Sequence, residues 1–247
     1  LDGRHAPMGL LLDPTLRVIG ITGLAGFDGL IASARALPPS DQHAGAELFA
    51  PVLLVPRVFE RALCARLIDL YRASDSSDSG FMREVEGQTV GILDHAFKRR
   101  RDCVIEDRDL VELCRDRIQR RLLPEIKRCF QFTATRIERY IVARYGAEEG
   151  GFFKAHRDDT TPGTAHRKFA VTMNLNAEDF SGGDLRFPEF GNRLYRCPTG
   201  GAIVFSCSVM HEATPVRAGE RFVFLPFLYD EEGAEIRERN LSSVRVG

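Results

Sequence analysis

The chain has 247 residues, 44% of them hydrophobic and 28% charged, and its formal net charge at pH 7 is −1. This length fits one large β domain or two small domains, and the near-neutral charge gives no general attraction to nucleic acid or to anionic membranes. No apolar run reaches the roughly 20 residues of a membrane-spanning helix, and the first residues lack the basic and apolar regions of a signal peptide, so we expect a cytoplasmic protein.

Residues 1–50 form a segment of their own. The stretch LRVIGITG at 16–23 predicts a short buried strand, and DGLIASARAL at 28–37 predicts a helix that ends before two prolines. The following SDQHAGAEL at 40–48 has the composition of a linker. One strand and one helix cannot bury both of their faces, so this partial αβ segment is expected to pack on the main domain or on residues outside the sequence.

Two helices are expected in the next part of the chain. The segment 58–74 has apolar residues at helical spacing and ends at a Ser/Asp cluster. The segment 107–130 also has an apolar stripe, which Pro124 kinks or divides. Between them, residues 74–101 are polar, contain three glycines and end in the basic run Lys98–Arg101.

After Phe132 the sequence consists of short alternating or apolar segments bounded by Gly, Pro or Asn. Many short strands without helices between them are typical of an antiparallel sandwich or barrel. We therefore expect an α+β, mainly β protein with the preceding helices packed outside and a polar, surface-exposed tail at 230–247. The expected strands are TRIERYIVARYG (135–146), RKFAVTMNLN (167–176), GGDLRFPEFG (182–191), GAIVFSCS (201–208), HEATPV (211–216) and RFVFLPFLYD (221–230).

The cysteines are scattered and include no C-x-x-C pair. In a chain of this length without secretory features, buried or free thiols are expected rather than disulfides or zinc ligands. The six residues are Cys64, Cys103, Cys114, Cys129, Cys197 and Cys207.

A candidate metal site involves two histidines and one aspartate. His156 and Asp158 are two residues apart, so in a strand they point to the same side. His211 follows the apolar strand GAIVFSCSV and supplies a third ligand from another strand. Two imidazoles and one carboxylate with open positions are the ligand set of non-haem Fe(II) oxygenases, and the same residues also suit zinc in a hydrolase.

Arg221 favours the oxygenase over the hydrolase. It stands ten residues after His211 and opens a strand rich in Phe, Val and Leu. A guanidinium in such a strand is costly unless an anion meets it, and its planar fork suits a carboxylate. 2-Oxoglutarate supplies that carboxylate at the end remote from the iron, whereas a zinc hydrolase has no such need.

The segment from about Tyr140 to Tyr229 resembles the prolyl 4-hydroxylase-like branch of the Fe(II)/2-oxoglutarate oxygenases. The pieces that carry the resemblance, in this order, are YGAEEGGFFKAHRD, RKFAVTMNLN, FSGGDLRFPEFG, CPTGGAIVFSCSVMHEATPV and GERFVFLPFLY. The resemblance implies a double-stranded β-helix (jelly-roll, cupin-like) core at about 135–230, within a dioxygenase domain at 51–247.

The resemblance also implies the cofactors and their residues. Fe(II) would be held by His156, Asp158 and His211, 2-oxoglutarate by Arg221 with Tyr145 nearby, and L-ascorbate is a further cofactor of such enzymes. One departure concerns the central strand, where relatives often carry a tyrosine before Leu-Asn and this chain has Asn174. Asn174 and Thr172 share a face of that strand and are candidates to donate hydrogen bonds to the cosubstrate.

The substrate side is predicted from the polar segment 79–101. It is too long for an ordinary connector and corresponds to a mobile substrate loop of the family, so we expect a lid that closes over the active site. Candidate substrate contacts are Arg99, Arg100, Arg101 and His95, although a basic run is more often a solvated face. His166, like His95, is expected to be a solvated loop residue.

The predicted reaction is hydroxylation of a C–H bond of a prolyl, peptidyl or amino-acid-like substrate, consuming O2 and 2-oxoglutarate and releasing succinate and CO2. The same chemistry on a small metabolite, a zinc-dependent hydrolase and a non-catalytic binding module on the same barrel stay open as alternatives. Residues 1–50 lie outside this resemblance and are similar to the end of a thioredoxin-fold (redoxin) domain followed by a linker.

Overall fold

The computed structural model describes residues 7–39, 42 and 48–245. It divides into two compact units. The first contains the residues up to Ala50 together with Arg186–Leu194, and the second contains Pro51–Leu185 together with Tyr195–Gly247. Most of the linker-like stretch 40–48 falls outside the described residues.

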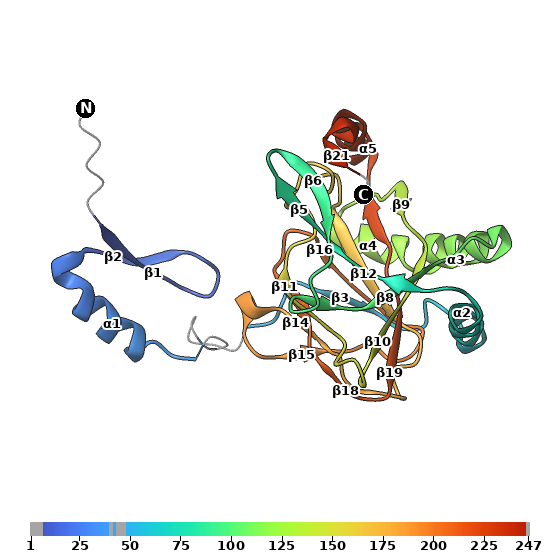
Figure 1. Ribbon diagram of the computed structural model, residues 1–247, viewed down its shortest axis with the longest axis horizontal. Coiled ribbons are helices and arrows are strands. Elements are labelled where there is room, and N and C mark those ends of the chain that lie inside the picture. The colour runs from blue at the N-terminus through green and yellow to red at the C-terminus, as the bar shows by residue number, and fades with distance from the viewer. Residues whose placement is uncertain (1–6, 40–41, 43–47, 246–247) are drawn as a thin grey trace. The chain divides into compact units, whose positions relative to one another are not determined.

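The first unit contains a hairpin and a helix (Figure 1). Strand β1 (Met8–Leu12) pairs antiparallel with β2 (Val18–Gly23), and η1 (Leu24–Gly26) leads into α1 (Phe27–Ala36). The strand and helix expected here are present, whereas β1 was not predicted. The expectation of a buried strand is wrong, because every residue of β2 is exposed or half-buried, as a single hairpin and helix cannot cover both faces of the strands. The similarity to a redoxin domain stays a prediction.

The second unit is built around a nine-stranded sheet whose strand pairs are antiparallel. Its order is β3-β16-β12-β19-β10-β8-β4, with β20 joining β12 and β9 joining β20. The expected mainly β character is therefore confirmed. The strands are β3 (Leu53–Val55), β4 (Ser77–Asp78), β8 (Arg101–Val104), β9 (Arg136–Glu138), β10 (Ile141–Gly146), β12 (Phe169–Asn174), β16 (Ala202–Ser206), β19 (Glu220–Phe224) and β20 (Phe227–Tyr229).

A second sheet contains the strands on which His156 and His211 lie. Its order includes β17-β11-β7, formed by His211–Ala213, Phe152–His156 and Lys98–Arg99. The remaining strands form small ladders: β13 (Ser181–Gly182) with β18 (Val216–Ala218), and β21 (Val244–Arg245) with β6 (Gln88–Ile92) and β5 (Phe81–Val85). Where the chain passes between the two units stand β14 (Leu185–Arg186), η2 (Pro188–Phe190) and β15 (Leu194–Tyr195).

Helices of the second unit share a core with the large sheet. They are α2 (Arg61–Ala73), α3 (Arg108–Arg121) and α4 (Leu123–Phe130), whereas α5 (Glu231–Arg239) and the short η3 (Leu241–Ser243) contribute no residue to that core cluster. Leu67 of α2, Ile118 of α3 and Ile126 of α4 are fully buried in one cluster with Val142 and Phe224 of the sheet. In Figure 1, α2 and α3 lie on one side of the strands.

Sequence signals explain where α3 and α4 begin. The carboxylate of Asp107 caps α3 by accepting hydrogen bonds from the backbone N–H groups of Asp109 and Leu110. Pro124 lies in the first turn of α4, where its missing N–H costs nothing, so the expected division of this helical segment is confirmed.

Four of the expected strands are interrupted. The segment 182–191 is divided among β13, β14 and η2, and the segment 211–216 between β17 and β18. The segment 135–146 is interrupted at Arg139, which adopts a left-handed backbone conformation with φ of 55°. The segment 221–230 is interrupted at Pro226, which cannot donate a ladder hydrogen bond. The tail was expected to be polar and surface-exposed, and it contains a helix that was not predicted, α5, of which only Gly233 is buried. The Asp230 carboxylate caps this helix by accepting a hydrogen bond from the Gly233 N–H.

The thiols follow expectation with one exception. The six cysteines are free, and five of them are buried, but Cys129 in α4 is exposed and is not a core residue. Among the described residues, no helix is both long and apolar enough to cross a bilayer.

Candidate metal centre

Two neighbouring strands of the second sheet bring two histidines together. In the antiparallel pair β11–β17, His156 stands opposite His211, and their ring centres are 4.3 Å apart. Asp158 lies two residues beyond the end of β11, in a bend fixed by a hydrogen bond of 2.9 Å from its N–H to the Cys207 carbonyl. The shared side of a strand is therefore not what aligns His156 with Asp158, since the strand has already ended.

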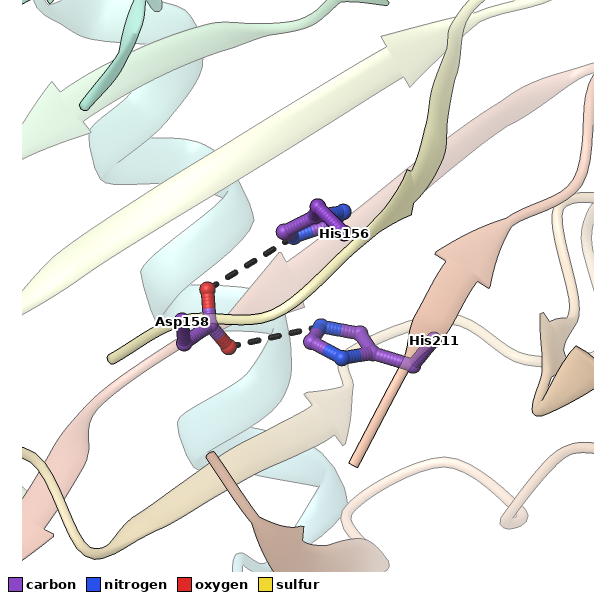
Figure 2. A group of neighbouring side chains, drawn as sticks. All are labelled: His156, Asp158 and His211. Atoms are coloured by element: carbon purple, nitrogen blue, oxygen red, sulfur yellow. Dashed lines mark ion pairs between the residues drawn. The ribbon is translucent and has the colours of Figure 1, made fainter. Parts of the chain in front are cut away.

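The three side chains converge on one point (Figure 2). The Asp158 carboxylate has one oxygen 3.5 Å from Nε2 of His156 and the other 3.3 Å from Nε2 of His211. One ligand atom from each residue lies within 4.8 Å of the other two. This spacing fits a single metal ion bound on one face by all three residues.

Backbone carbonyls fix the tautomers of both imidazoles. Nδ1 of His156 lies 2.7 Å from the Lys154 carbonyl, and Nδ1 of His211 lies 3.0 Å from the Val209 carbonyl. A carbonyl oxygen only accepts, so each Nδ1 carries the proton and donates it. Each Nε2 therefore directs a lone pair toward the Asp158 side, as in metal-binding histidines held by outer hydrogen bonds.

The electrostatics also suit a cation. Burial and the nearby His211 lower the pKa of His156, although Asp158 opposes this, so the ring is neutral and able to ligate. A buried carboxylate between two imidazole lone pairs needs positive charge, and Fe(II) or Zn(II) would supply it.

Arg221 is a buried cation near this site. It is 2% exposed, stands opposite Tyr145 in the pair β10–β19, and lies 5.1 Å from the centre of the tyrosine ring. Its Nε has no hydrogen-bond partner among the described residues, and burial lowers its pKa. Gly183, with φ of +67°, leaves room for it, because a Cβ there would be 3.0 Å from Cδ of Arg221. An unpaired guanidinium at this depth calls for an anionic ligand.

One cavity of about 480 Å³ contains both features. The three candidate ligands, Arg221, Tyr145 and Thr172 all line it. Asn174 does not, because its side-chain amide donates to the Cys197 carbonyl at 2.8 Å and is held away from the cavity wall. The structure thus brings Thr172 to the expected cosubstrate region and leaves Asn174 outside it.

The basic run is only half solvated. Arg99 and Arg101 are exposed, as is His95, which lies 3.6 Å from Asp78, and none of the three lines the cavity. Lys98 and Arg100 do line it and are buried, so for them the expectation of a solvated face is wrong.

A hydrogen-bonded network causes that burial. Arg100 makes two contacts of 2.7 and 2.6 Å with the Asp102 carboxylate. The Ser79 hydroxyl donates to the same carboxylate at 2.6 Å and accepts from the Lys98 ammonium at 2.7 Å. Satisfying each polar group in this way is what allows the cluster to be buried.

The segment 79–101 is not one continuous loop, so that part of the lid expectation is wrong. Its end belongs to β7 and β8, which pair with β11 and β10. Its middle forms the hairpin β5–β6, which projects from the second unit (Figure 1). Residues 80–84 of this hairpin line the cavity, so the segment still borders the candidate site.

A second buried cluster was missed by the sequence. His166, expected to be solvated, is 2% exposed, and its Nε2 donates to the Glu138 carboxylate at 2.8 Å. Arg167 binds the same carboxylate with contacts of 2.9 and 2.6 Å and also donates to the Asp158 carbonyl at 3.4 Å. The only sequence signal is a set of charges among the apolar positions of TRIERYIVARYG. The cluster supports the backbone of a candidate ligand.

Comparison with known proteins agrees with this geometry. Residues 140–229 match the family model of the 2OG-Fe(II) oxygenase superfamily. A PKHD-type hydroxylase of Alteromonas mediterranea is 32% identical over 74 residues, which are 29% of this chain and 33% of that protein. The chain therefore spans about a third of the length of this curated relative.

Solved structures extend the similarity to most of the chain. A prolyl hydroxylase of Trichoplax adhaerens, in complex with a hypoxia inducible factor peptide, matches 75% of this chain and 86% of its own with a TM-score of 0.57 and 16% identity. A Pseudomonas putida prolyl-4-hydroxylase matches 77% of this chain and 96% of its own, with a TM-score of 0.54 and 17% identity. At these identities the similarity establishes the fold, and these neighbours belong to a family with a double-stranded β-helix.

Proposed function

We propose, from the membership of residues 140–229 in the 2OG-Fe(II) oxygenase superfamily, that this protein is an Fe(II)- and 2-oxoglutarate-dependent dioxygenase that hydroxylates a C–H bond. The observation that carries the proposal is the unpaired Arg221 guanidinium in the same cavity as the His156–Asp158–His211 cluster. A metal site alone fits several reactions. A metal site with a buried cation awaiting a carboxylate fits a 2-oxo diacid as cosubstrate.

Each residue has a separable role in this proposal. The Nε2 atoms of the two histidines and the Asp158 carboxylate would hold the metal, leaving positions open for the 2-oxo acid and O2. Arg221 would fix the remote carboxylate, with Tyr145 packed against its guanidinium. When bound, Fe(II) with 2-oxoglutarate and O2 supplies the oxidation that inserts oxygen into the substrate, releasing succinate and CO2.

Apolar walls would keep water from the reacting centre. The Phe153 ring stacks on His156 at 3.5 Å between ring centres, and the Phe205 ring lies 4.5 Å from the ring of His211. Both phenylalanines line the cavity. They hold the imidazoles in place and shield the metal–ligand bonds from solvent.

For the substrate we propose a prolyl, peptidyl or amino-acid-like compound. The support is that the structural neighbours named above are prolyl hydroxylases, and that a viral collagen prolyl hydroxylase also matches, with a TM-score of 0.51. L-Ascorbate would serve as a reductant that keeps the iron in its ferrous state. Arg99, Arg100, Arg101 and His95 stay predicted substrate contacts from the sequence, although only Arg100 of these lines the cavity.

An anaerobic titration tests the proposal directly. Fe(II) and 2-oxoglutarate added to the protein should produce the weak visible absorption band of the metal–keto acid chelate, and exposure to O2 should convert 2-oxoglutarate to succinate. A screen of prolyl peptides and amino acids would then look for a mass gain of one oxygen. Zinc binding without 2-oxoglutarate turnover would favour the hydrolase alternative, and binding of neither would leave a non-catalytic module.

A further inference from the structure

The cavity holds more positive charge than the proposed cosubstrate needs. Seven cationic side chains line it, against two acidic ones. Arg100 and Arg167 are balanced by carboxylates behind the wall, Asp102 and Glu138, each at 2.6 Å. At the metal, the positive charges of Fe(II) and Arg221 would balance the negative charges of Asp158 and the 2-oxoglutarate dianion.

Four of the cations lie outside this balance. Arg83 is exposed, Lys98 and Arg157 donate to the Ser79 hydroxyl and the Ser208 carbonyl, and Arg139 is the fourth. It is half-buried and lines the cavity. Its Nε donates to the Leu225 carbonyl at 3.0 Å, and its guanidinium lies 4.3 Å from the centre of the Phe227 ring. Among the described residues, its two terminal nitrogens make no hydrogen bond or ion pair. Its contacts therefore fix the plane of the guanidinium and leave its outer edge, the part that binds oxyanions in two-point contacts, without a partner.

The backbone at Arg139 is unusual as well. This residue separates β9 from β10 with φ of 55°, a conformation that few residues other than glycine adopt. Strained conformations of this kind persist where the surroundings hold them, and they cluster at functional sites. The result here is a side chain placed in the cavity wall instead of continuing the alternation of a strand.

The charged groups near Arg139 either repel it or are already paired with another cation. Arg100 and Arg167 repel it, and the carboxylates of Asp102 and Glu138 are paired with these two arginines. Burial, Arg100 and Arg167 together lower its pKa to about 10, so it stays protonated at neutral pH. Lys98, also in the wall, has its pKa lowered by burial and by Arg100. Besides Tyr145, the charges that act most on Arg221 are those of Asp184 and Arg196, so Arg139 and Arg221 occupy different electrostatic surroundings.

We infer that Arg139, with Lys98 in the same cavity wall, binds an oxyanion carried by the hydroxylated substrate, a carboxylate or a phosphate. This deepens the function proposed above and rests on it. The substrate is thus an acid: it is held by its charge at Arg139 while a C–H bond faces the metal. A neutral prolyl peptide without such a group would leave the wall uncompensated and would bind poorly.

Anion binding to the cosubstrate-loaded protein tests this without knowing the substrate. Fe(II) and saturating 2-oxoglutarate are added anaerobically, and sodium acetate or sodium sulfate is titrated against chloride at constant ionic strength. The visible chelate band reports whether Arg221 stays occupied, and Tm reports binding. Modification of arginines by phenylglyoxal, mapped by mass spectrometry, reports protection of Arg139. Acetate and sulfate distinguish a site for carboxylates from one for phosphate-like dianions.

We expect a saturable rise in Tm and slower modification of Arg139, with the chelate band unchanged. Arg139→Gln should weaken the anion effect by roughly tenfold or more, as expected for loss of a charge-assisted hydrogen bond. Lys98→Met should weaken it less. The control Arg136→Gln alters an exposed arginine that pairs with Glu231 at 2.8 Å and should bind as the unaltered protein does.

Four outcomes would count against the inference. A chelate band with no saturable anion effect would overturn the oxyanion site and leave the oxygenase proposal intact. Equal anion affinity in Arg139→Gln, or an Arg139 that the anions do not protect in the unaltered protein, would do the same. Absence of the chelate band would overturn the oxygenase proposal, and this inference with it.

Discussion

Tyr145 and Arg221 stand directly opposite each other on β10 and β19, with the guanidinium 5.1 Å from the tyrosine ring centre. The ring covers a cation that has no acidic partner among the described residues, and this pairing fixes where a carboxylate can enter. Register between two strands thus places the proposed cosubstrate anchor, since a shift by one residue would turn Arg221 to the other face of the sheet.

Replacing Arg221 by lysine should weaken the binding of 2-oxoglutarate without affecting the binding of the metal. Lysine keeps the charge but loses the two-point geometry, and loss of a hydrogen bond to a charged group costs about 1.5–3 kcal/mol, roughly a tenfold or greater rise in KM. Fe(II) affinity, measured without 2-oxoglutarate, should stay nearly constant. The control Arg217→Lys changes an exposed arginine on β18 and should leave KM unaltered. An unchanged KM in Arg221→Lys would remove Arg221 from the cosubstrate site.

The metal assignment predicts that His211→Ala loses metal binding and, with it, the turnover of 2-oxoglutarate. Removing one of three ligands leaves Asp158 and His156 unable to hold the ion firmly, so both the visible chelate band and 2-oxoglutarate decay should disappear. His95→Gln, an exposed histidine outside the cavity lining, should keep both. Retention of the band in His211→Ala would contradict the proposed ligand set.

The Glu138 cluster predicts a specific dependence of stability on pH. Burial alone would raise the pKa of Glu138, but hydrogen bonds from His166 and Arg167 outweigh it and depress the pKa far below 4.5. A carboxylate with a depressed pKa contributes stability above its unfolded-state pKa, and this contribution is lost as the pH falls below it.

The variant Glu138→Gln should therefore be destabilised at pH 7 by about 3–5 kcal/mol, because Arg167 is left buried and unpaired. The difference from the unaltered protein should shrink as the pH falls below about 4, where the carboxylate of the unfolded chain is protonated. Urea unfolding at several pH values measures this. A difference that is constant from pH 7 to pH 3 would mean that the glutamate acts through packing and not through its charge.

The sequence predicted the features that depend on neighbouring residues or on the spacing of apolar residues along the chain. Alternation and turn residues gave the strands of the mainly β core, apolar spacing gave α2 and α3, and the resemblance pointed to His156, Asp158 and His211. The sequence could not assign a role to Glu138, Arg139 or Arg167, because the role of each depends on which charged groups lie near it after folding. Arg100 and Arg101 illustrate the limit: they are adjacent in the same basic run, yet one is buried against Asp102 and the other is exposed.

The prediction of a loop for the polar segment 74–101, after α2, was wrong for a different reason. Its residues have no apolar period, so the sequence indicated a loop, but backbone pairing with β10, β11 and β21 supplies the order that side chains do not. What remains of the expected lid is the hairpin β5–β6. Whether it controls access depends on how firmly it is held.

Thr89 is the residue that holds this hairpin. It is 1% exposed, its hydroxyl accepts a hydrogen bond of 2.8 Å from the Gly163 N–H, and it pairs with Val244 in the parallel ladder β21–β6. Thr89→Val keeps the shape but leaves the Gly163 N–H without its acceptor, which costs about 1–3 kcal/mol. Because residues 80–84 of the same hairpin line the cavity, loosening it should open the cavity wall.

We expect Thr89→Val to raise the substrate KM while 2-oxoglutarate decay without substrate is unchanged, since the metal ligands and Arg221 are untouched. Limited proteolysis at the Glu86–Gly87 turn should be faster by roughly the tenfold that such a loss of local stability implies. Thr89→Ser keeps the hydroxyl and should restore both properties, and Thr133→Val, at an exposed threonine, should change neither. If Thr89→Val is cleaved and turns over substrate like the unaltered protein, backbone pairing alone fixes the hairpin and it does not act as a lid.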